Sequence, residues 1–437
     1  MKSYRKLVPP AMILIMVLSW YLLITETRET KDEYGGYLSE ARKYADIGVT
    51  KYAVENYRKA LALSPSPELY TEVAQYYKGQ EKKEEELLAW CEEFLEQYPK
   101  EPKAYDCLLE TYRLQEDYAS CYDILYTADK RKVSSEYLTE IRKEIEYVYK
   151  MDFNTYDDVS IYSNNYCAVK SKDAWGYVDR YGNQRISATY AEAAAFTKSN
   201  FAPVINSRGE AYFIDKSGSR VLASKENYRS FGILADEKIL AQLENGKFVY
   251  VNEEFQKLSE EYDEATAMNG GVAAVRTGEK WKLVGPEFEE LSSETFDSVV
   301  VDEKRIAYRN DRLFVESGGK ILMVDSSGRQ VGSQTYEDAR IFSDGTYAAV
   351  KQKGQWYFVD KDGTPKSEKR YEDARSYANG LAAVKINGKW GFVDEEEEIK
   401  IEPSFFGAKD FNEKGSCFVQ TGDKWQLLKL YRLNREE

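Results

Sequence analysis

The stretch Asn387–Glu398, NGKWGFVDEEEE, joins a Trp-Gly pair to two apolar residues, an Asp and a block of four acids. The same pair recurs in KDAWGYVDRYGN at residues 172–183, where an Asp again follows the Gly by three positions. A motif that returns in this way is either a chemical site or the unit of a repeat. A search for further copies distinguishes the two.

Eight segments after residue 151 align on this stretch. The Trp position is held in turn by Trp175, Ala211, Phe248, Trp281, Ile321, Trp356, Trp390 and Trp425, with spacings from 33 to 40 residues. A second aromatic marker, followed three residues later by a small or apolar residue, recurs at Tyr156, Tyr190, Tyr228, Tyr262, Phe296, Tyr336, Tyr371 and Phe405. Short alternating runs between Gly, Asp and Asn predict strands and hairpins, so each unit is predicted to contain four strands.

The turn after the third strand reads Asp-x-x-Gly in four copies. An Asp that accepts from the backbone two residues on, followed by a Gly with positive φ, makes a tight hairpin without a metal ion. In the opening stretch, Glu395–Glu398 stands where the sister copies have this turn, which predicts an altered, solvated turn. Asp360–Gly363, DKDG, lacks the remaining ligands of a calcium loop, so no metal site is expected.

These residues resemble the WG-repeat family of bacterial surface and secreted proteins, whose unit is a KWGFVD-x-x-G hairpin with a Y-x-x-A element. Trp175-Gly176 and Trp390-Gly391 match both letters of the motif, and Trp281, Trp356 and Trp425 keep the Trp. The resemblance covers residues 151–437 and implies a repeat fold, with no established activity to carry across. The positions that it marks as structural are Trp175, Gly176, Trp281, Trp356, Trp390, Gly391, Trp425, Tyr156, Tyr190, Tyr262, Tyr336 and Tyr371.

Four-stranded units either close into a β-propeller or stack into an open rod. KMDFNTY, residues 150–156, fits the fourth strand of a unit whose other strands are missing, and the last copy nearly stops after its third strand. The first piece would complete the last unit and remove the exposed edges of a rod. The sequence therefore favours a propeller of seven or eight blades, with an open β-repeat stack as the alternative.

Residues 34–150 show helical periodicity with turn signals about every 33 residues. Tyr37, Ala41 and Tyr44 share one helical face, and Ala53, Tyr57 and Ala60 share another in the same spacing. Ser66 and Pro67 suit a helix start, and a charged helix at 134–151 is expected to cover the end. The pattern resembles tetratricopeptide repeats, which implies a peptide- or protein-binding groove, or a spacer in so short an array.

Residues 7–24, LVPPAMILIMVLSWYLLI, carry no charge and are just long enough for a bilayer core. Basic residues precede the run at 1–6, and the charged linker 25–33 follows it. This arrangement predicts an uncleaved signal anchor, a single transmembrane helix with a cytoplasmic stub at 1–6 and the rest of the chain outside. The expected location is the cell membrane of a bacterium, with the bulk of the chain extracytoplasmic.

Composition excludes several classes of function. The 437 residues contain no His, which removes the commonest general base and most zinc sites, and the net charge of −14 argues against nucleic-acid binding. Cys91, Cys107, Cys121, Cys167 and Cys417 show no metal spacing, and sequence alone leaves open whether any of them pair.

The sequence therefore predicts a multidomain α and β protein that is not an enzyme and needs no cofactor. The leading function is a membrane-anchored extracytoplasmic scaffold or adaptor that binds a protein or cell-wall partner through its repeats. A glycan- or peptidoglycan-binding propeller is the alternative, since spare aromatic rings stack on sugars. A glycoside-hydrolase type of site is the least supported, because no spacing marks a pair of carboxylates.

Overall fold

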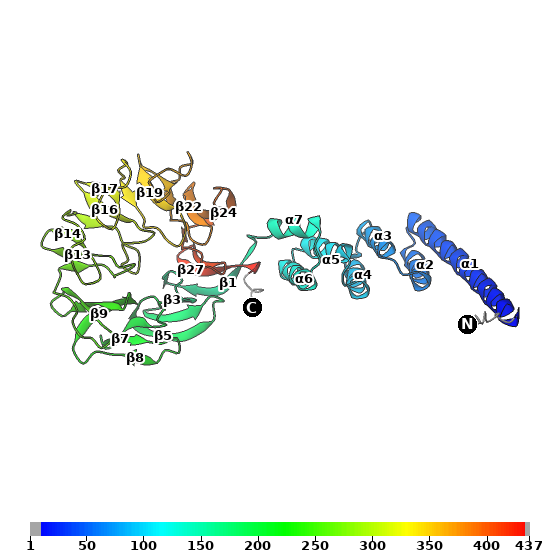
Figure 1. Cartoon of the computed structure of the whole chain (residues 1–437), viewed down its shortest axis with the longest axis horizontal. Coiled ribbons are helices and arrows are strands. Elements are labelled where there is room, and N and C mark those ends of the chain that lie inside the picture. The colour runs from blue at the N-terminus through cyan, green and yellow to red at the C-terminus, as the bar shows by residue number, and fades with distance from the viewer. Residues whose placement is uncertain (1–9, 433–437) are drawn as a thin grey trace, which may run out of the picture. The chain divides into compact units, whose positions relative to one another are not determined.

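The computed structural model describes residues 10–432 and divides the chain into a helical unit that ends at Glu146 and a β-unit that begins at Tyr147. The helical unit contains α1 (Pro10–Asp46), α2 (Thr50–Leu63), α3 (Pro67–Lys78), α4 (Glu84–Gln97), α5 (Pro102–Leu114), α6 (Tyr118–Arg131) and α7 (Glu136–Glu144). These helices pack as successive antiparallel neighbours (Figure 1). Ser66 accepts a hydrogen bond from the Leu69 amide, with Pro67 in the first turn, so α3 begins where the sequence predicts.

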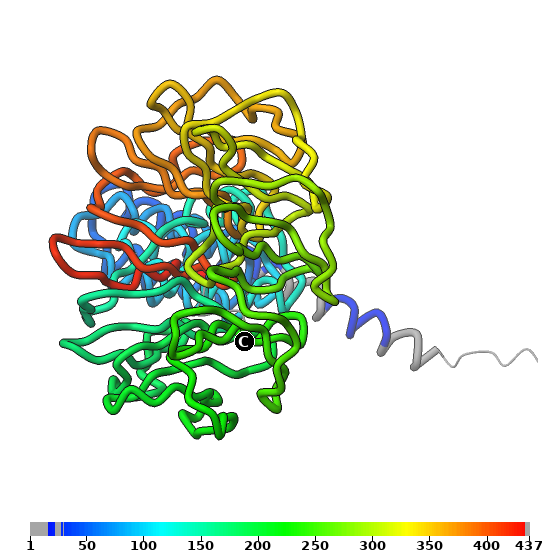
Figure 2. The backbone as a smooth tube through the Cα atoms, turned by 90° about the vertical axis from the view of Figure 1, so that its left-hand side faces the viewer, coloured from blue at the N-terminus to red at the C-terminus, as the bar shows by residue number. Residues whose placement is uncertain are grey.

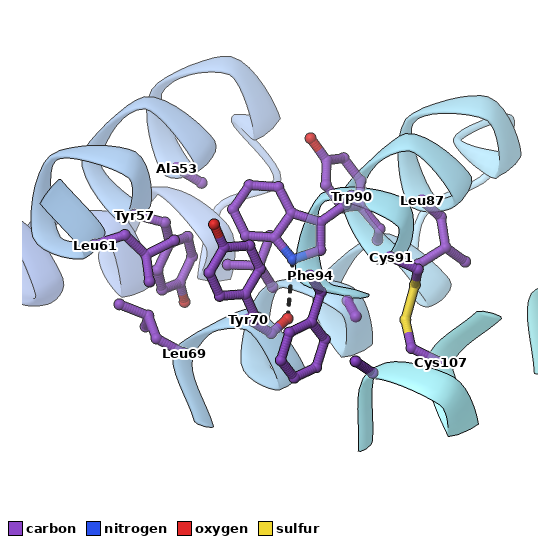
Figure 3. Close-up of a cluster of buried hydrophobic side chains, with 14 of the residues drawn as sticks. Ala53, Tyr57, Leu61, Leu69, Tyr70, Leu87, Trp90, Cys91, Phe94 and Cys107 are labelled. Atoms are coloured by element: carbon purple, nitrogen blue, oxygen red, sulfur yellow. Dashed lines mark hydrogen bonds between the residues drawn. A yellow bond between two sulfur atoms is a disulfide. The ribbon is translucent and has the colours of Figure 1, made fainter. Parts of the chain in front are cut away.

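Aromatic rings fill the helical core. Trp90 is 2% exposed and donates its indole N–H to the carbonyl of Tyr70 at 2.9 Å, while the Tyr70 ring stacks on Phe94 (Figure 3). One side of this core is closed by a disulfide between Cys91 of α4 and Cys107 of α5, which resolves the pairing that the sequence leaves open. Closing a loop of this size stabilises the folded state by about 3 kcal/mol in the chain-entropy model.

The long helix α1 corrects two expectations about the start of the chain. Residues 25–33, expected as a linker, are helical within α1. In the part of the chain that the structure describes, no helix has both the length and the apolar content to cross a membrane. The expected transmembrane helix at 7–24 is therefore wrong, and so is the single-pass cell-membrane location derived from it.

The physical reason lies in the length of the uncharged run inside α1. Residues 1–9 lie outside the described chain, so the cytoplasmic stub at 1–6 and the first part of the 7–24 segment are not described. From Pro10 to Ile24 a helix rises about 22 Å, short of a hydrocarbon core of roughly 30 Å. The helix then continues without a break through charged residues to Asp46.

The β-unit is a ring of seven hydrogen-bonded sheets (Figure 1). We divide it into eight blades, one for each repeat and numbered in chain order; β5 pairs with β6, so blades 1 and 2 share one seven-stranded sheet. Blade 1 contains β2 (Asp158–Val159), β3 (Tyr166–Ser171), β4 (Ala174–Asp179) and β5 (Gln184–Ala193); blade 2 contains β6 (Ala202–Asn206), β7 (Ala211–Ile214) and β8 (Arg220–Leu222). Blade 3 contains β9 (Tyr228–Ala235), β10 (Lys238–Leu243) and β11 (Phe248–Val251); blade 4 contains β12 (Glu264–Ala265), β13 (Ala273–Thr277) and β14 (Lys280–Val284).

The second half of the ring follows the same plan. Blade 5 contains β15 (Ser298–Val299), β16 (Leu313–Ser317) and β17 (Lys320–Val324); blade 6 contains β18 (Asp338–Ala339), β19 (Ala348–Gln352) and β20 (Gln355–Val359). Blade 7 contains β21 (Asp373–Ala374), β22 (Ala382–Ile386), β23 (Lys389–Val393) and β24 (Ile399–Phe405); blade 8 contains β25 (Gly407–Ala408), β26 (Ser416–Thr421), β27 (Lys424–Leu430) and β1 (Tyr149–Tyr156).

Blade 8 is assembled from both ends of the unit. β1 pairs antiparallel with β27, as the incomplete first repeat predicts, and the last strands lie beside the first strands in a second view (Figure 2). A separate apolar cluster lies between each pair of neighbouring blades, including one in which Val169 and Val178 of blade 1 meet Phe418 and Leu427 of blade 8. The ring is therefore closed by backbone pairing within blade 8 and by side-chain packing between blades 8 and 1.

The helix expected at 134–151 is shorter than predicted, because α7 ends at Glu144 and β1 begins at Tyr149. Residues 146–151, EYVYKM, contain a β-branched residue between two aromatic ones, a composition that suits a strand as well as a short helix. Tyr147, Tyr149 and Met151 are half-buried against the apolar cluster between blades 7 and 8. Tertiary packing thus decides the conformation of this segment.

Candidate functional site

The positions that the sequence marks as structural lie in the blades and do not gather into one site. In seven blades of the described ring, the residue at the Trp position is paired across the strands with the aromatic marker. These pairs are Trp175 with Tyr190, Phe248 with Tyr262, Trp281 with Phe296, Ile321 with Tyr336, Trp356 with Tyr371, Trp390 with Phe405 and Trp425 with Tyr156. Trp356 and Trp390 are buried, whereas Trp175, Trp281 and Trp425 are half-buried.

The Gly of the Trp-Gly pair lies where the next strand bulges towards it. The register between β23 and β24 shifts between Trp390 and Phe392, where Gly391 lies, and a Cβ at this position would lie 2.5 Å from the carbonyl oxygen of Ile401. Gly176 has the same surroundings, with 2.5 Å to the carbonyl oxygen of Ile186. No side chain fits at that separation, so the Trp-Gly motif records a close approach of two backbones.

The acidic block at Glu395–Glu398 forms the altered turn that its alignment predicts, but the turn is not solvated throughout. Glu397 is 4% exposed and accepts a hydrogen bond from the Tyr371 hydroxyl at 3.4 Å, whereas the other three acids are exposed. Oδ1 of Asp394 accepts from the amides of Glu396 and Glu398, just as Oδ1 of Asp360 accepts in the DKDG turn. Glu397 takes the left-handed conformation, φ 57°, that Gly363 takes in the sister turn.

A different feature occupies the axis of the ring. The link between β15 and β16 in blade 5 runs over thirteen residues, 300–312, whereas the equivalent link in blade 7 runs over seven, 375–381. We call residues 301–307 of this link the plug. Asp302 builds its tip, because Oδ1 accepts from the amides of Lys304 and Ile306, each at 2.9 Å, while Arg305 takes a positive φ.

The plug reaches blades on several sides of the ring. Ile306 is buried in an apolar cluster with Ile233, Ala267 and Ile341, from blades 3, 4 and 6. Glu303 forms an ion pair with Lys409 of blade 8, with the two charged atoms 2.7 Å apart. The plug thus contacts blades 3, 4, 6 and 8 and leaves one side of the axis open.

The open side is a cavity of about 550 Å³ that the plug and the inner loops of six blades surround. It is lined by residues 161–165, 198, 300–304, 309, 339–344, 375–376, 378–379 and 410–413. Its wall is charged, but most charges are matched. Arg375 contacts both carboxylate oxygens of Asp410, and Arg340 pairs with Asp373 at 2.9 Å.

The pKa values of the two wall arginines reflect these pairs. Burial opposes the charge of Arg375, but Asp410 outweighs burial and holds the Arg375 pKa above its usual value. Burial dominates at Arg340, whose pKa is lowered despite Asp373.

Lys304, at the tip of the plug, has a weaker electrostatic partner than the two wall arginines. Its ammonium donates to the hydroxyl of Ser163 in blade 1 at 3.0 Å, and within residues 10–432 no carboxylate lies within ion-pair distance of it. Burial first, and the neighbouring Arg309 second, lower the pKa of Lys304. Arg309 pairs with Asp302 at 3.1 Å, yet its buried Nε has no acceptor among the described residues.

None of the site residues predicted from the sequence lines this cavity. One signal for it was present, because the spacing of 40 residues between Trp281 and Ile321 is the longest in the series and places the insertion in this repeat. The direction in which that insertion folds depends on contacts with other blades. Within the described residues, no group of three or more His, Cys, Asp or Glu is placed to hold a metal ion.

Comparison with known proteins agrees with the repeat reading of the β-unit. The family model described as "WG containing repeat" matches residues 175–206, 250–281, 324–356, 358–390 and 390–425. No curated protein matches the chain.

Several solved structures are similar at low identity. The computationally designed Ika8 protein has 11% identity and a TM-score of 0.44, over 62% of this chain and 96% of that one. Sqt1 of Chaetomium thermophilum, bound to the N-terminus of ribosomal protein L10, has 12% identity and a TM-score of 0.40, over 63% of this chain and 98% of that one. The WD40 β-propeller domain of Doa1 has 11% identity and a TM-score of 0.32, over 64% of this chain and 97% of that one. The β-unit therefore contains WG containing repeats in these five segments, which lie between residues 175 and 425.

Proposed function

We propose that this chain is a non-catalytic scaffold that binds a protein partner at the plugged cavity of its β-ring. The observation that carries the proposal is the cavity itself, which six blades and the plug build from inner loops. Loops on a rigid scaffold are where binding proteins place their contacts, and a concave site with convergent polar groups is the default binding site of a fold.

The rim of the cavity offers contacts of the kind that protein partners use. Lys198, Asp344 and Glu413 are exposed charges at its margin, and Val301 of the plug is an apolar side chain that is 42% exposed. The floor is rigid, because its ion pairs and the Ile306 cluster tie the plug to several blades. A rigid site loses little conformational entropy when a partner binds.

We assign the helical unit a supporting role as a second binding surface or spacer of the tetratricopeptide type. Cation and carboxylate pairs join its alternate helices at similar sequence distances. They are Arg42 with Glu72, Arg58 with Glu93, Lys78 with Glu110 and Arg113 with Glu144. This ladder holds successive helix pairs in one stack, as expected for a stiff array.

Site-specific photo-crosslinking in cells that express the full chain tests the scaffold function. A photoreactive amino acid at Glu413, on the rim, is expected to trap a partner protein in a reproducible band. The matched control is Asp423, exposed in the turn at the other end of the same strand, β26. No crosslink at Glu413, or equal crosslinks at both positions, would contradict binding at the cavity.

A further inference from the structure

We propose that the cavity binds a carboxylate group of the partner, with the Lys304 ammonium as its principal contact. The proposal rests on the scaffold function above and assigns it a ligand chemistry. It is carried by the position of Lys304 at the tip of the plug, on the wall of the open cavity and in contact with Ser163.

The charges around Lys304 are already committed to other partners. Asp302 bonds with Arg309 and with two backbone amides, Glu303 bonds with Lys409, and Asp410 bonds with Arg375. The three acids nearest to the plug are therefore occupied, and the Lys304 ammonium donates to one neutral hydroxyl, that of Ser163. Lys304 is half-buried and is attracted by Asp302, Glu303 and Asp410, yet it forms no direct ion pair with any described residue. An anion that enters the cavity supplies this direct partner.

The neighbouring guanidinium adds a second incomplete match. Arg309 lines the same cavity and leaves its buried Nε without an acceptor among the described residues. Asp302 therefore satisfies this side chain in part, and two cations lie side by side in the wall. Their mutual repulsion contributes to the lowered pKa of Lys304.

The charged groups around the cavity favour a ligand that carries a single negative charge. One unmatched ammonium balances one carboxylate, whereas a phosphate dianion would leave excess negative charge next to Asp302, Glu303 and Asp410. A peptide carboxylate, from an acidic side chain or a chain terminus, is thus the chemistry that the cavity fits.

The test uses a library of random peptides that are displayed with free C-termini. Peptides that bind the immobilised full chain are selected in a buffer that contains no acetate. Selected peptides are then synthesised in three forms: unchanged, with Asp and Glu replaced by Asn and Gln, and with an amidated C-terminus. Loss of binding in the second form assigns an acidic side chain, and loss in the third assigns the terminal carboxylate. Either loss, of about tenfold or more, supports the proposal.

Variants of the chain locate the contact. K304M removes the charge but keeps the stem, and is expected to weaken the selected peptides about tenfold or more. K225M removes an exposed charge from the link between β8 and β9, outside the cavity lining, and is expected to leave affinity within about twofold. K304M is also expected to unfold at a higher temperature than the parent, because it removes a desolvated charge, so a folded variant is available for comparison.

Three results would overturn the proposal: peptides whose binding ignores carboxylates, peptides that bind K304M unchanged, or inorganic phosphate competing better than acetate. The outcomes separate it from the scaffold function. If a partner trapped at Glu413 still binds K304M, the proposed carboxylate contact is contradicted but the scaffold function is not. If no partner is trapped at Glu413, the scaffold function is contradicted, whatever affinity the selected peptides show.

Discussion

Trp425, in the last strand of blade 8, lies directly across from Tyr156, at the end of the first strand of the β-unit. The same pairing of a Trp position with an aromatic marker occurs inside single repeats elsewhere, as between Trp390 and Phe405. Blade 8 therefore reproduces the repeat by joining two distant parts of the chain. Lys424 with Asp157 and Lys429 with Asp152 add ion pairs on either side of this junction.

Replacing Gly391 with Ala is expected to destabilise the β-unit by about 1–3 kcal/mol, because the added Cβ would meet the carbonyl oxygen of Ile401 and force the bulged strand away. Urea unfolding followed by tryptophan fluorescence measures the loss. Lys282 follows Trp281 at the equivalent place in blade 4 and provides the control, since K282A adds no atom and changes an exposed ion pair. Equal effects of the two substitutions would contradict the close-approach role.

Asn379 links two blades while it shapes a turn. Its φ is 52°, and its side-chain amide donates to the carbonyl of Phe411 in blade 8 at 2.8 Å. Asn379→Gly keeps the turn conformation but removes the bond, at an expected cost of about 1 kcal/mol. The control is Asn387→Gly, because Asn387 has a φ of 51° in the outer hairpin of the same blade. If N387G costs as much as N379G in urea unfolding, the link between the blades contributes nothing.

Acid is expected to weaken the closure of the ring. A hydrogen bond from Lys424 and one from the Lys172 amide lower the pKa of Asp157 below its usual value. A carboxylate with a lowered pKa in the folded state contributes stability that is complete above about pH 4 and is lost as pH falls through the folded value. D157N should therefore lose less stability than the parent between pH 5 and pH 3.

Urea midpoints measured across this pH range check the effect. Asp173, exposed in the turn that follows β3, supplies the control variant D173N, which should follow the parent. A D157N curve that falls as steeply as that of the parent would show that this pair does not matter for closure.

The five cysteines should fall into two classes of reactivity. Cys121, Cys167 and Cys417 are buried, and burial raises the pKa of Cys121 to about 11 and that of Cys167 to about 12. Thiolate formation is suppressed at neutral pH, so a thiol reagent should find no reactive group in the native chain. Titration should give three thiols after unfolding without reductant and five after reduction, because Cys91 and Cys107 are paired. Five thiols in the unfolded, unreduced chain would contradict the disulfide.

Local patterns in the sequence were enough to predict much of the β-unit. The markers at Trp390 and Tyr371 repeat with a period that predicts the repeated units, and KMDFNTY predicts the strand that completes blade 8. The four strands expected in every unit are present in blades 1, 7 and 8, whereas blades 2–6 have three. Each of these inferences depends on residues close together in the sequence or on a repeated unit. Cross-strand pairing then follows from the repeat itself.

The features that escaped prediction depend on contacts between distant residues. Lys304 meets Ser163 from the other side of the ring, and the 40-residue spacing indicates an insertion without its direction. Cys107 pairs with Cys91 because α4 and α5 pack together, whereas spacing alone allowed Cys121 as well. At the start of the chain, a hydropathy pattern treated as a separate element turned out to belong to the continuous helix α1.

A pair of cysteines across β1 and β27 tests the closed ring most directly. Thr155 lies opposite Gln426, so the double variant T155C/Q426C should form a disulfide within one chain under mild oxidation, detected by mass spectrometry of the digested monomer. T155C/Q420C places the second cysteine one strand farther, on β26, and should not form this link. An intramolecular 155–426 disulfide, absent in the control, is the result that the closed ring predicts. Failure of T155C/Q426C to link, or links formed between separate chains, would contradict it.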